Sequence, residues 1–285
     1  MLGKLTKHEF LACGRIAFPA YLIVLVLSVV GRFLTWLTSR EYFLNNIPLS
    51  FFKVIKLLSS LISSAYTLIF LSLLILTVFM MIYRFYKNYF TDEGYLMLTL
   101  PTGTPSLIFS KLFNSWIWIF FSAVVAIVSL WITIGHFDQV STSFANLWET
   151  IQNLIENHRD FLEDELGVPL WLFVVELVIL GFAYISNFLL SWYASVSFGM
   201  LISKKHKILG TLAGYFVLYM ITTIIHFIYL GTITTIVPNY YEILNNSSGQ
   251  ALQIVVLGST IIYVLFSCGY FALSNYILKH KLNLD

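Results

Sequence analysis

Charged residues are scarce in this chain: Asp, Glu, Lys and Arg make up 11% of its 285 residues, whereas hydrophobic residues make up 59%. An ordinary soluble domain carries about 25% charged residues, which help to cover its surface. The chain therefore has too little polar surface for a water-soluble fold, and lipid must be part of its solvent. A formal net charge of +2 is also too small for a nucleic-acid footprint, so no nucleic-acid partner is expected.

Several residues and motifs that would support chemistry are missing as well. Cys13 and Cys268 are the only cysteines, which gives no disulfide framework. The sequence has no glycine-rich phosphate cradle ending in Lys and Ser or Thr, so the chain is not expected to hydrolyse ATP by itself. His8 and Glu9 begin like a zinc-protease helix, but Ala12 stands where the second histidine would be. We predict no catalytic residue, no metal site and no bound cofactor, and no nucleophile and base pair supports an intramembrane hydrolase.

Long apolar runs are abundant. Crossing the hydrocarbon core takes about 20 apolar helical residues. Six runs qualify, at residues 16–38, 57–83, 107–135, 170–202, 208–236 and 251–278. They are continuously apolar and do not alternate in polarity, which indicates helices rather than barrel strands. The predicted fold class is an all-α integral membrane protein with six transmembrane helices, residues 1–285 forming one membrane domain.

The orientation follows from the basic residues, because those in short loops favour the cytoplasm. With the amino terminus inside, the cytoplasmic segments hold Lys4, Lys7, Arg15, Arg84, Lys87, Lys111, Lys204, Lys205, Lys207, Lys279 and Lys281. The outside then holds Arg32, Arg40, Lys53, Lys56 and Arg159. Acidic residues gather outside on this assignment: Asp138, Glu149, Glu156, Asp160, Glu163, Asp164, Glu165 and Glu242. Both termini of this multi-pass protein are therefore expected in the cytoplasm.

The largest external connection, residues 137–168, is predicted to form an amphipathic helix on the outer surface. Its apolar residues recur at helical spacing: Leu147, Trp148, Ile151, Leu154, Ile155, Phe161, Leu162 and Leu166. The opposite face, with Glu156, Asp160 and Glu163, fits a solvated face better than a metal site. Control of access from outside and a purely structural cover are both compatible with this pattern.

Two ionisable residues and one glycine pair stand out inside the apolar runs. Glu176 and His226 are candidates for a translocation pathway, because charge within a bilayer is costly and often functional. The structural alternatives are a Glu176 close to the outer surface and a neutral His226 that hydrogen-bonds a neighbouring helix. Gly210 and Gly214 form a GxxxG pattern that permits close helix packing, within the chain rather than between copies.

The cytoplasmic segment at residues 84–105 carries the strongest local signal. Thr91 can cap a short helix with Asp92 and Glu93 in its first turn, and Thr104 before Pro105 is suited to start the third span. Between these caps lies an aromatic and apolar surface beside charge. A tight interfacial loop that packs on its own bundle is the structural alternative to a partner-binding surface.

This segment resembles the coupling region of permease subunits of ATP-binding-cassette exporters of the second type, which have six spans. The resemblance rests on Tyr83, Arg84, Tyr86 and Lys87, on FTDEGYLMLTL at residues 90–100, on Pro101, and on residues 107–111. It implies that a short cytoplasmic coupling helix contacts a separate ATPase subunit. The implied contact residues are Phe90, Thr91, Asp92, Glu93, Gly94, Tyr95, Leu96 and Leu98.

The resemblance also implies what the assembly contains. ATP and Mg would bind the ATPase partner, and a second permease half, identical or homologous, would complete the transporter in membrane lipid. The expected function is export of a peptide, drug or lipid across a bacterial plasma membrane, with the ATPase activity on the separate subunit. The alternative is a membrane sensor or assembly subunit that recruits a cytoplasmic partner without transport.

The orientation is tested by single-cysteine labelling after both native cysteines are replaced. Lys204→Cys should react with a membrane-impermeant maleimide only after the membrane is opened, whereas Asp160→Cys and Asn246→Cys should react in intact cells. Labelling of position 204 from outside would reverse the predicted topology.

Overall fold

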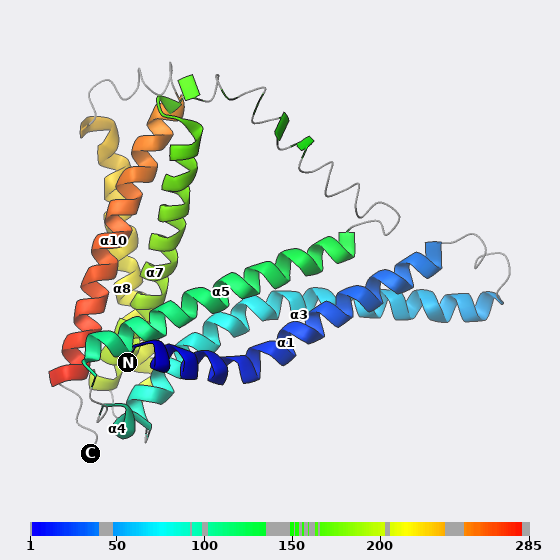
Figure 1. Ribbon diagram of the computed structural model, residues 1–285, viewed down its shortest axis with the longest axis horizontal. Coiled ribbons are helices and arrows are strands. Elements are labelled where there is room, and N and C mark those ends of the chain that lie inside the picture. The colour runs from blue at the N-terminus through cyan, green and yellow to red at the C-terminus, as the bar shows by residue number, and fades with distance from the viewer. Residues whose placement is uncertain are drawn as a thin grey trace. The chain divides into compact units, whose positions relative to one another are not determined.

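The computed structural model describes residues 2–39, 48–91, 93–98, 102–134, 149–150, 152–153, 156, 159, 163–164, 166–202, 206–236 and 248–280. No strand occurs among these residues. Six long helices are present (Figure 1): α1 Leu2–Ser39, α3 Leu49–Phe90, α5 Thr104–Ile134, α7 Leu170–Ile202, α8 Lys207–Ile236 and α10 Ser248–His280. All six are long and apolar enough to cross a membrane, which confirms the predicted all-α fold class.

Two helices extend well beyond their predicted spans. α1 begins at Leu2, so the basic amino-terminal residues continue the first span as one helix with Pro19 inside it. α3 runs from Leu49 to Phe90, adding turns at both ends of the predicted run. A helix satisfies its own backbone in water as well as in lipid, so it does not have to stop where the apolar run stops.

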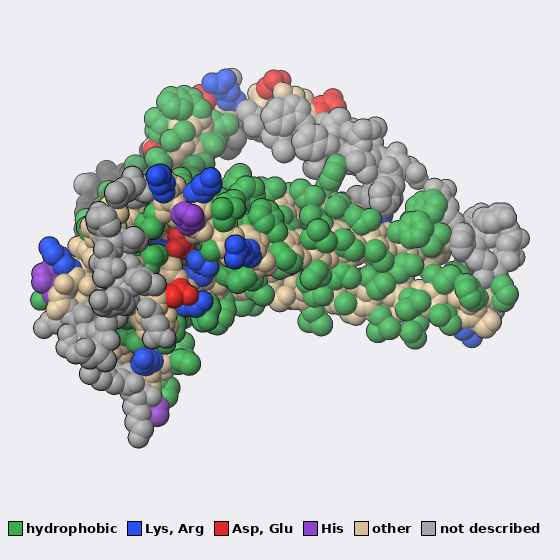
Figure 2. All heavy atoms as spheres, turned by 60° about the horizontal axis from the view of Figure 1, so that its bottom comes forward, with side chains coloured by type: hydrophobic (Ala, Val, Ile, Leu, Met, Phe, Trp, Pro, Cys, Tyr) green, Lys and Arg blue, Asp and Glu red, His purple; other side chains and the backbone are tan. Residues whose placement is uncertain are grey.

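The helices carry their large apolar side chains outward. Ile75 is 71% exposed, Phe120 67% and Ile208 78%, and Figure 2 shows hydrophobic side chains over most of the visible surface of the long helices. The buried residues include aromatic side chains such as Trp118 and Tyr193 together with many small hydroxyl residues. Ser110, Ser129 and Ser197 are fully buried and donate hydrogen bonds to carbonyl oxygens of their own helices. Lipid-facing bulk with small residues at helix contacts is the expected pattern for a membrane protein.

The chain divides into two compact units, residues 1–83 with 113–145 and residues 84–112 with 146–285, and the division falls within α3 and α5. Polar contacts tie the helices of the first unit together. The Tyr21 hydroxyl of α1 donates to the Trp118 carbonyl of α5 at 3.3 Å. The Tyr66 hydroxyl of α3 donates to Ser129 Oγ of α5 at 3.2 Å. Each contact satisfies a buried hydroxyl where no water is available.

In the second unit, α7 packs against both α8 and α10, which contact each other much less (Figure 1). The backbones of α7 and α8 approach closely at Gly199, where a Cβ atom would lie 2.4 Å from the Thr211 amide nitrogen. A Cβ on Gly210 would lie 2.9 Å from the Gly199 carbonyl oxygen, and one on Gly214 would lie 3.5 Å from the Ser195 carbonyl oxygen. The GxxxG pair therefore lies against α7 of the same chain.

The start of α7 is fixed by the residues before it. Gly167 has a φ of 70° and its amide donates to the Glu163 carbonyl, which ends a helical turn before Pro169 opens α7. The Glu163 carboxylate accepts hydrogen bonds from Arg159 Nε and the Leu170 amide at 2.9 and 3.2 Å, and these hold its pKa below the ordinary value. Such a group stabilises the fold above its unfolded pKa, and this contribution is lost as pH falls through the folded pKa.

Much of the predicted external helix lies outside the described residues, including Leu147, Trp148, Ile151, Leu154, Ile155, Asp160, Phe161 and Leu162. The described ones from Glu149 to Leu166 are helical. Leu166 is buried in a cluster with Phe173 of α7 and Val256 of α10, so the end of this segment packs on the spanning helices. The amphipathic face as a whole stays a prediction.

The backbone contact at Gly199 gives a test of the α7–α8 packing. Gly199→Ala should lower the stability of the hairpin by about 1–3 kcal/mol, because its methyl group meets backbone atoms that cannot turn away. Gly181→Ala is a matched control in the same helix, since a Cβ there has nothing within 4 Å. Apparent melting temperatures in detergent, measured by fluorescence-detected size-exclusion chromatography, should fall for the first variant only. Equal melting temperatures would show that α7 and α8 are farther apart.

Candidate functional site

The predicted coupling segment forms a corner between two long helices. After α3 ends at Phe90, the short helix α4 spans Glu93–Leu98, and α5 begins at the predicted Thr104. Gly94 lies so close to α3 that a Cβ atom would be 2.6 Å from the Tyr89 carbonyl oxygen. The close approach of these two backbones explains why glycine is needed at this position.

Thr91 connects the end of α3 to the start of α4. Its hydroxyl donates to the Lys87 carbonyl of α3 at 2.5 Å, and its carbonyl accepts the Gly94 amide of α4 at 2.7 Å. A hydroxyl at the end of a helix can bond the carbonyl four residues earlier, as here. The hydroxyl hydrogen of Thr91 therefore serves α3, and the predicted side-chain cap of α4 stays a prediction.

The predicted partner-contact residues differ in their surroundings. Phe90 is buried near Phe85, and Gly94 is buried against Tyr89. Glu93 is about half exposed and pairs with Lys87 at 2.9 Å. Asp92 and the side chains of Tyr95, Leu96 and Leu98 lie outside the described residues. Phe90 and Gly94 thus hold the corner together from inside, and Glu93 is on its surface.

Two contacts join this corner to the spanning helices of the second unit. Phe85, fully buried, stacks on Tyr193 of α7 with ring centroids 4.1 Å apart and planes 8° apart. Thr104 donates from its hydroxyl to Asn275 Oδ1 of α10 at 2.5 Å. Lys111 of α5 lies over the Tyr89 ring, 5.8 Å from its centroid. The corner is therefore attached to α7 and α10 through side chains, and a displacement of the corner would act on both helices.

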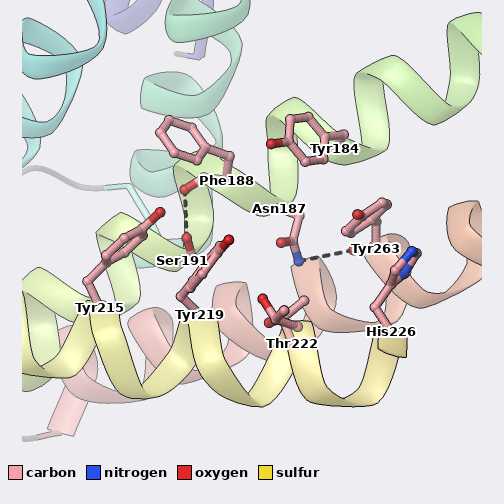
Figure 3. A pocket seen from close by; sticks show the side chains of 10 residues that line it. Tyr184, Asn187, Phe188, Ser191, Tyr215, Tyr219, Thr222, His226 and Tyr263 are labelled. Carbon is pink, nitrogen blue, oxygen red and sulfur yellow. Dashed lines mark hydrogen bonds between the residues drawn. The ribbon is translucent and has the colours of Figure 1, made fainter. Parts of the chain in front are cut away.

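A cavity of about 220 Å³ lies among α7, α8 and α10. It is lined by aromatic and hydroxyl or amide side chains: Tyr184, Asn187, Phe188 and Ser191 of α7, Tyr215, Tyr219, Thr222, Thr223 and His226 of α8, and Tyr263 of α10 (Figure 3). The position of the cavity follows from the helix packing. α8 and α10 both pack against α7 but contact each other little, which leaves space between them.

Aromatic contacts shape the cavity wall. His226 stacks on Tyr263 at 5.4 Å, and Tyr184 meets the same ring edge-on at 5.4 Å. Tyr215 stacks on Trp192 at 3.8 Å. Farther along, the Tyr229 ring lies against Gly258 and its hydroxyl donates to the Ile254 carbonyl of α10 at 2.9 Å. Side chains from α8 thus bridge to α10 where the helix backbones stay apart.

Of the two predicted pathway residues, only His226 lines the cavity, and its Nδ1 is buried without a hydrogen-bond partner among the described residues. Glu176 lies eleven residues before Asn187, about three helical turns, so the two share a face of α7. Its Oε2 atom is likewise buried without a partner among the described residues. The structure therefore separates two residues that the sequence grouped together.

Sequence reasoning missed the tyrosines and the amide of the cavity. Tyr215, Tyr219, Thr222 and His226 recur at steps of four, three and four residues, which places them on one face of α8. Such a polar stripe inside an apolar run is a readable signal. The stripe was missed because tyrosine is counted as an apolar residue when transmembrane spans are identified from hydropathy.

The lining has the character of a ligand-binding site. In the described parts of the chain, no group of three or more His, Cys, Asp or Glu residues is placed to hold a metal ion. The cavity instead offers ring faces and neutral oxygens, which can hold a ligand by stacking and hydrogen bonds. Comparisons with protein-family models, curated protein sequences and solved structures found no match to this chain.

The close approach at Gly94 provides a test of the corner. Gly94→Ala should loosen the packing of α4 on α3 by about 1–3 kcal/mol while leaving the spanning helices folded, because the new methyl group meets the Tyr89 backbone. Gly103→Ala is the control at the same corner, since its Cβ would make only an ordinary 3.5 Å contact with Pro105. Limited proteolysis should cut the first variant faster at residues 91–103. Equal cutting rates would show that α4 is not packed on α3.

Proposed function

We propose that this chain is the membrane-spanning permease subunit of an ATP-driven exporter of the second type in a bacterial plasma membrane. A separate ATPase subunit would bind ATP and Mg and dock on the α3–α4–α5 corner. A second permease half, identical or homologous, would complete the transporter. The cargo classes to consider are a peptide, a drug or a lipid.

The observation that carries the proposal is the attachment of the corner to the helices that line the cavity. Phe85 stacks on Tyr193, which is two residues from the lining residue Ser191 of α7. Thr104 bonds Asn275 on α10, the helix that contributes Tyr263. A partner that moves the corner would therefore bias the arrangement of α7 and α10 around the cavity, as the coupling of two conformational states requires.

The basic residues support a cytoplasmic position of the corner, since Arg84, Lys87 and Lys111 flank it. Glu93 lies on the corner surface and is paired with Lys87, so it can set the orientation of a docked partner. An exposed ion pair contributes only about 0–1 kcal/mol, however, and an aromatic anchor such as Tyr95 is expected to supply more of the binding energy.

The alternative function, recruitment of a partner by a sensor or assembly subunit, would use the same corner but would not need the cavity. The cavity near the middle of three membrane-spanning helices favours transport. Substrate flux separates the two functions, because a sensor would bind its partner and stimulate no transport.

The proposal is tested by purifying the full chain from native membranes in a mild detergent together with its ATPase. Tyr95→Ala should weaken ATPase retention by about tenfold or more, because it removes the proposed anchor. The double change Asp92→Asn with Glu93→Gln should weaken it by at most about fivefold. Glu156→Gln, an exposed acidic residue of the external segment, is the control and should leave retention unchanged.

ATPase activity and transport by reconstituted vesicles are measured separately from retention. Loss of transport-linked ATPase activity in the corner variants, with normal membrane insertion, is the expected result. Wild-type retention, ATPase activity and flux in both corner variants would reduce the corner to a passive turn. Absence of any ATPase in the purified complex would favour the sensor function.

A further inference from the structure

The cavity lies near the middle of its three helices. Asn187, Thr222 and Tyr263 are each close to the centre of α7, α8 and α10, which have 33, 30 and 33 residues. A helix crosses the hydrocarbon core, about 30 Å thick, with about 20 residues, so these central positions fall near the bilayer midplane. A ligand held there lies among protein side chains at the depth of the hydrocarbon core.

The lining residues contain four tyrosine rings and no Lys, Arg, Asp or Glu. An inorganic ion that holds its hydration shell tightly would find no charged ligand to replace its water. An anion would find no cationic partner, so its burial would be costly. The tyrosine faces, however, carry negative quadrupole potential, which attracts a large and weakly hydrated organic cation.

Two hydroxyl groups of the cavity lining, those of Ser191 and Thr222, use their hydrogens within the protein. Ser191 donates to the Phe188 carbonyl at 2.7 Å (Figure 3). The Thr222 and Tyr270 hydroxyls bond each other and the Leu218 carbonyl, which accounts for both of their hydrogens. The remaining oxygen lone pairs of Ser191 and Thr222 are acceptors, and acceptors suit a ligand with positive charge.

Asn187 adds a further acceptor. Its Nδ2 atom points to the Tyr263 carbonyl at 3.5 Å, which turns the amide oxygen toward the tyrosines of α8 (Figure 3). The figure also shows aromatic rings on both sides of this amide, with Tyr215 and Tyr219 on one side and Tyr263 on the other. A cation beside Asn187 would lie between two sets of rings.

The size of the cavity limits what part of a ligand it can hold. Its volume of about 220 Å³ is below the range of roughly 300–1,000 Å³ that is usual for drug-sized ligands. A trialkylammonium head group fits this space, and a long apolar tail would remain among the helices and lipid.

Glu176, on the same face of α7 as Asn187, is the single acidic residue in the described parts of α7, α8 and α10.

We infer that this tyrosine-lined cavity is a binding site for the organic ammonium head group of a cationic amphiphile. The inference that a cationic amphiphile is the cargo rests on the proposed transport function. The inference that the cavity binds an ammonium group does not, because binding concerns this chain alone. Tyr219 of α8 and Tyr184 of α7, which are 51% and 55% exposed, are the rings with the most free surface to receive the ligand.

The experiment measures equilibrium binding of radiolabelled dodecyltrimethylammonium to the full chain in phosphatidylglycerol nanodiscs, without any ATPase. Empty nanodiscs give the background from partition into lipid. Binding should be saturable, and the uncharged carbon isostere 2,2-dimethyltetradecane should not displace the probe. Lack of saturable binding, or equal competition by the uncharged isostere, would overturn the inference.

Variants at Tyr219 distinguish the contribution of the ring face to binding from that of the hydroxyl group. Tyr219→Leu should weaken binding by about 3- to 30-fold, whereas Tyr219→Phe should stay within about twofold of the original chain, because phenylalanine keeps the π-face. Tyr276→Leu is the matched control on α10, since Tyr276 is 54% exposed and does not line the cavity. A leucine variant that binds normally, or a phenylalanine variant as weak as leucine, would contradict a ring-face site.

Replacing an uncharged glucolipid by phosphatidylcholine at a constant share of phosphatidylglycerol identifies the source of the head group, because the surface charge that attracts the probe stays the same. Loss of probe binding in the choline lipid would identify a lipid as the natural ligand, and unchanged binding would identify a free amphiphile; both outcomes support an ammonium site. If the chain binds the probe but has no ATPase partner and transports no substrate, the proposed transport function is refuted and the binding site stands. If the chain transports a substrate but does not bind the probe, the assignment of the cavity as an ammonium site is refuted and the transport function stands.

Discussion

The contact between the backbones of α7 and α8 at Gly199 fixes much of what lies around it. In lipid there is no hydrophobic force to press two helices together, so close contact of small residues must supply the attraction. Gly199 meets Gly210 and Thr211 backbone to backbone. Farther along, α8 contributes Tyr215 and Tyr219 to the cavity lining, and Tyr215 stacks on Trp192 of α7. The glycine contact thus holds α8 on α7 beside the space that α8 and α10 leave between them.

Small residues at helix contacts recur elsewhere in the described parts of the chain. Many bulky apolar side chains face outward, where lipid accommodates them, whereas buried serines and threonines lie beside a few large rings such as Phe85 and Tyr193. Hydroxyl groups that would be costly in a dry interior bond carbonyl oxygens of their own helices. Other hydroxyl groups make polar contacts between helices, such as Tyr66 with Ser129 and Thr222 with Tyr270.

The six spans could be predicted because hydrocarbon leaves few alternatives to an apolar helix, and the GxxxG pair could be predicted because its signal is local. The extra turns of α1 and α3 could not be predicted from hydropathy, because helical turns outside the bilayer do not need to be apolar. The stacking of Phe85 on Tyr193 joins residues that are far apart in the sequence, and no local sequence pattern predicts it. Within the candidate site, His226 was found as an ionisable residue, whereas its tyrosine neighbours were read as part of an ordinary span.

The length of α3 has a consequence for where its residues lie. Its 42 residues give an axial length of about 63 Å, roughly twice the thickness of the hydrocarbon core. Transmembrane helices tilt by about 0–40° from the bilayer normal. Even at a tilt of about 40°, α3 would extend about 48 Å along the normal, so about a third of its length must lie in the head-group region or in water. A single helix thus provides both a membrane span and a surface that water-soluble molecules can reach.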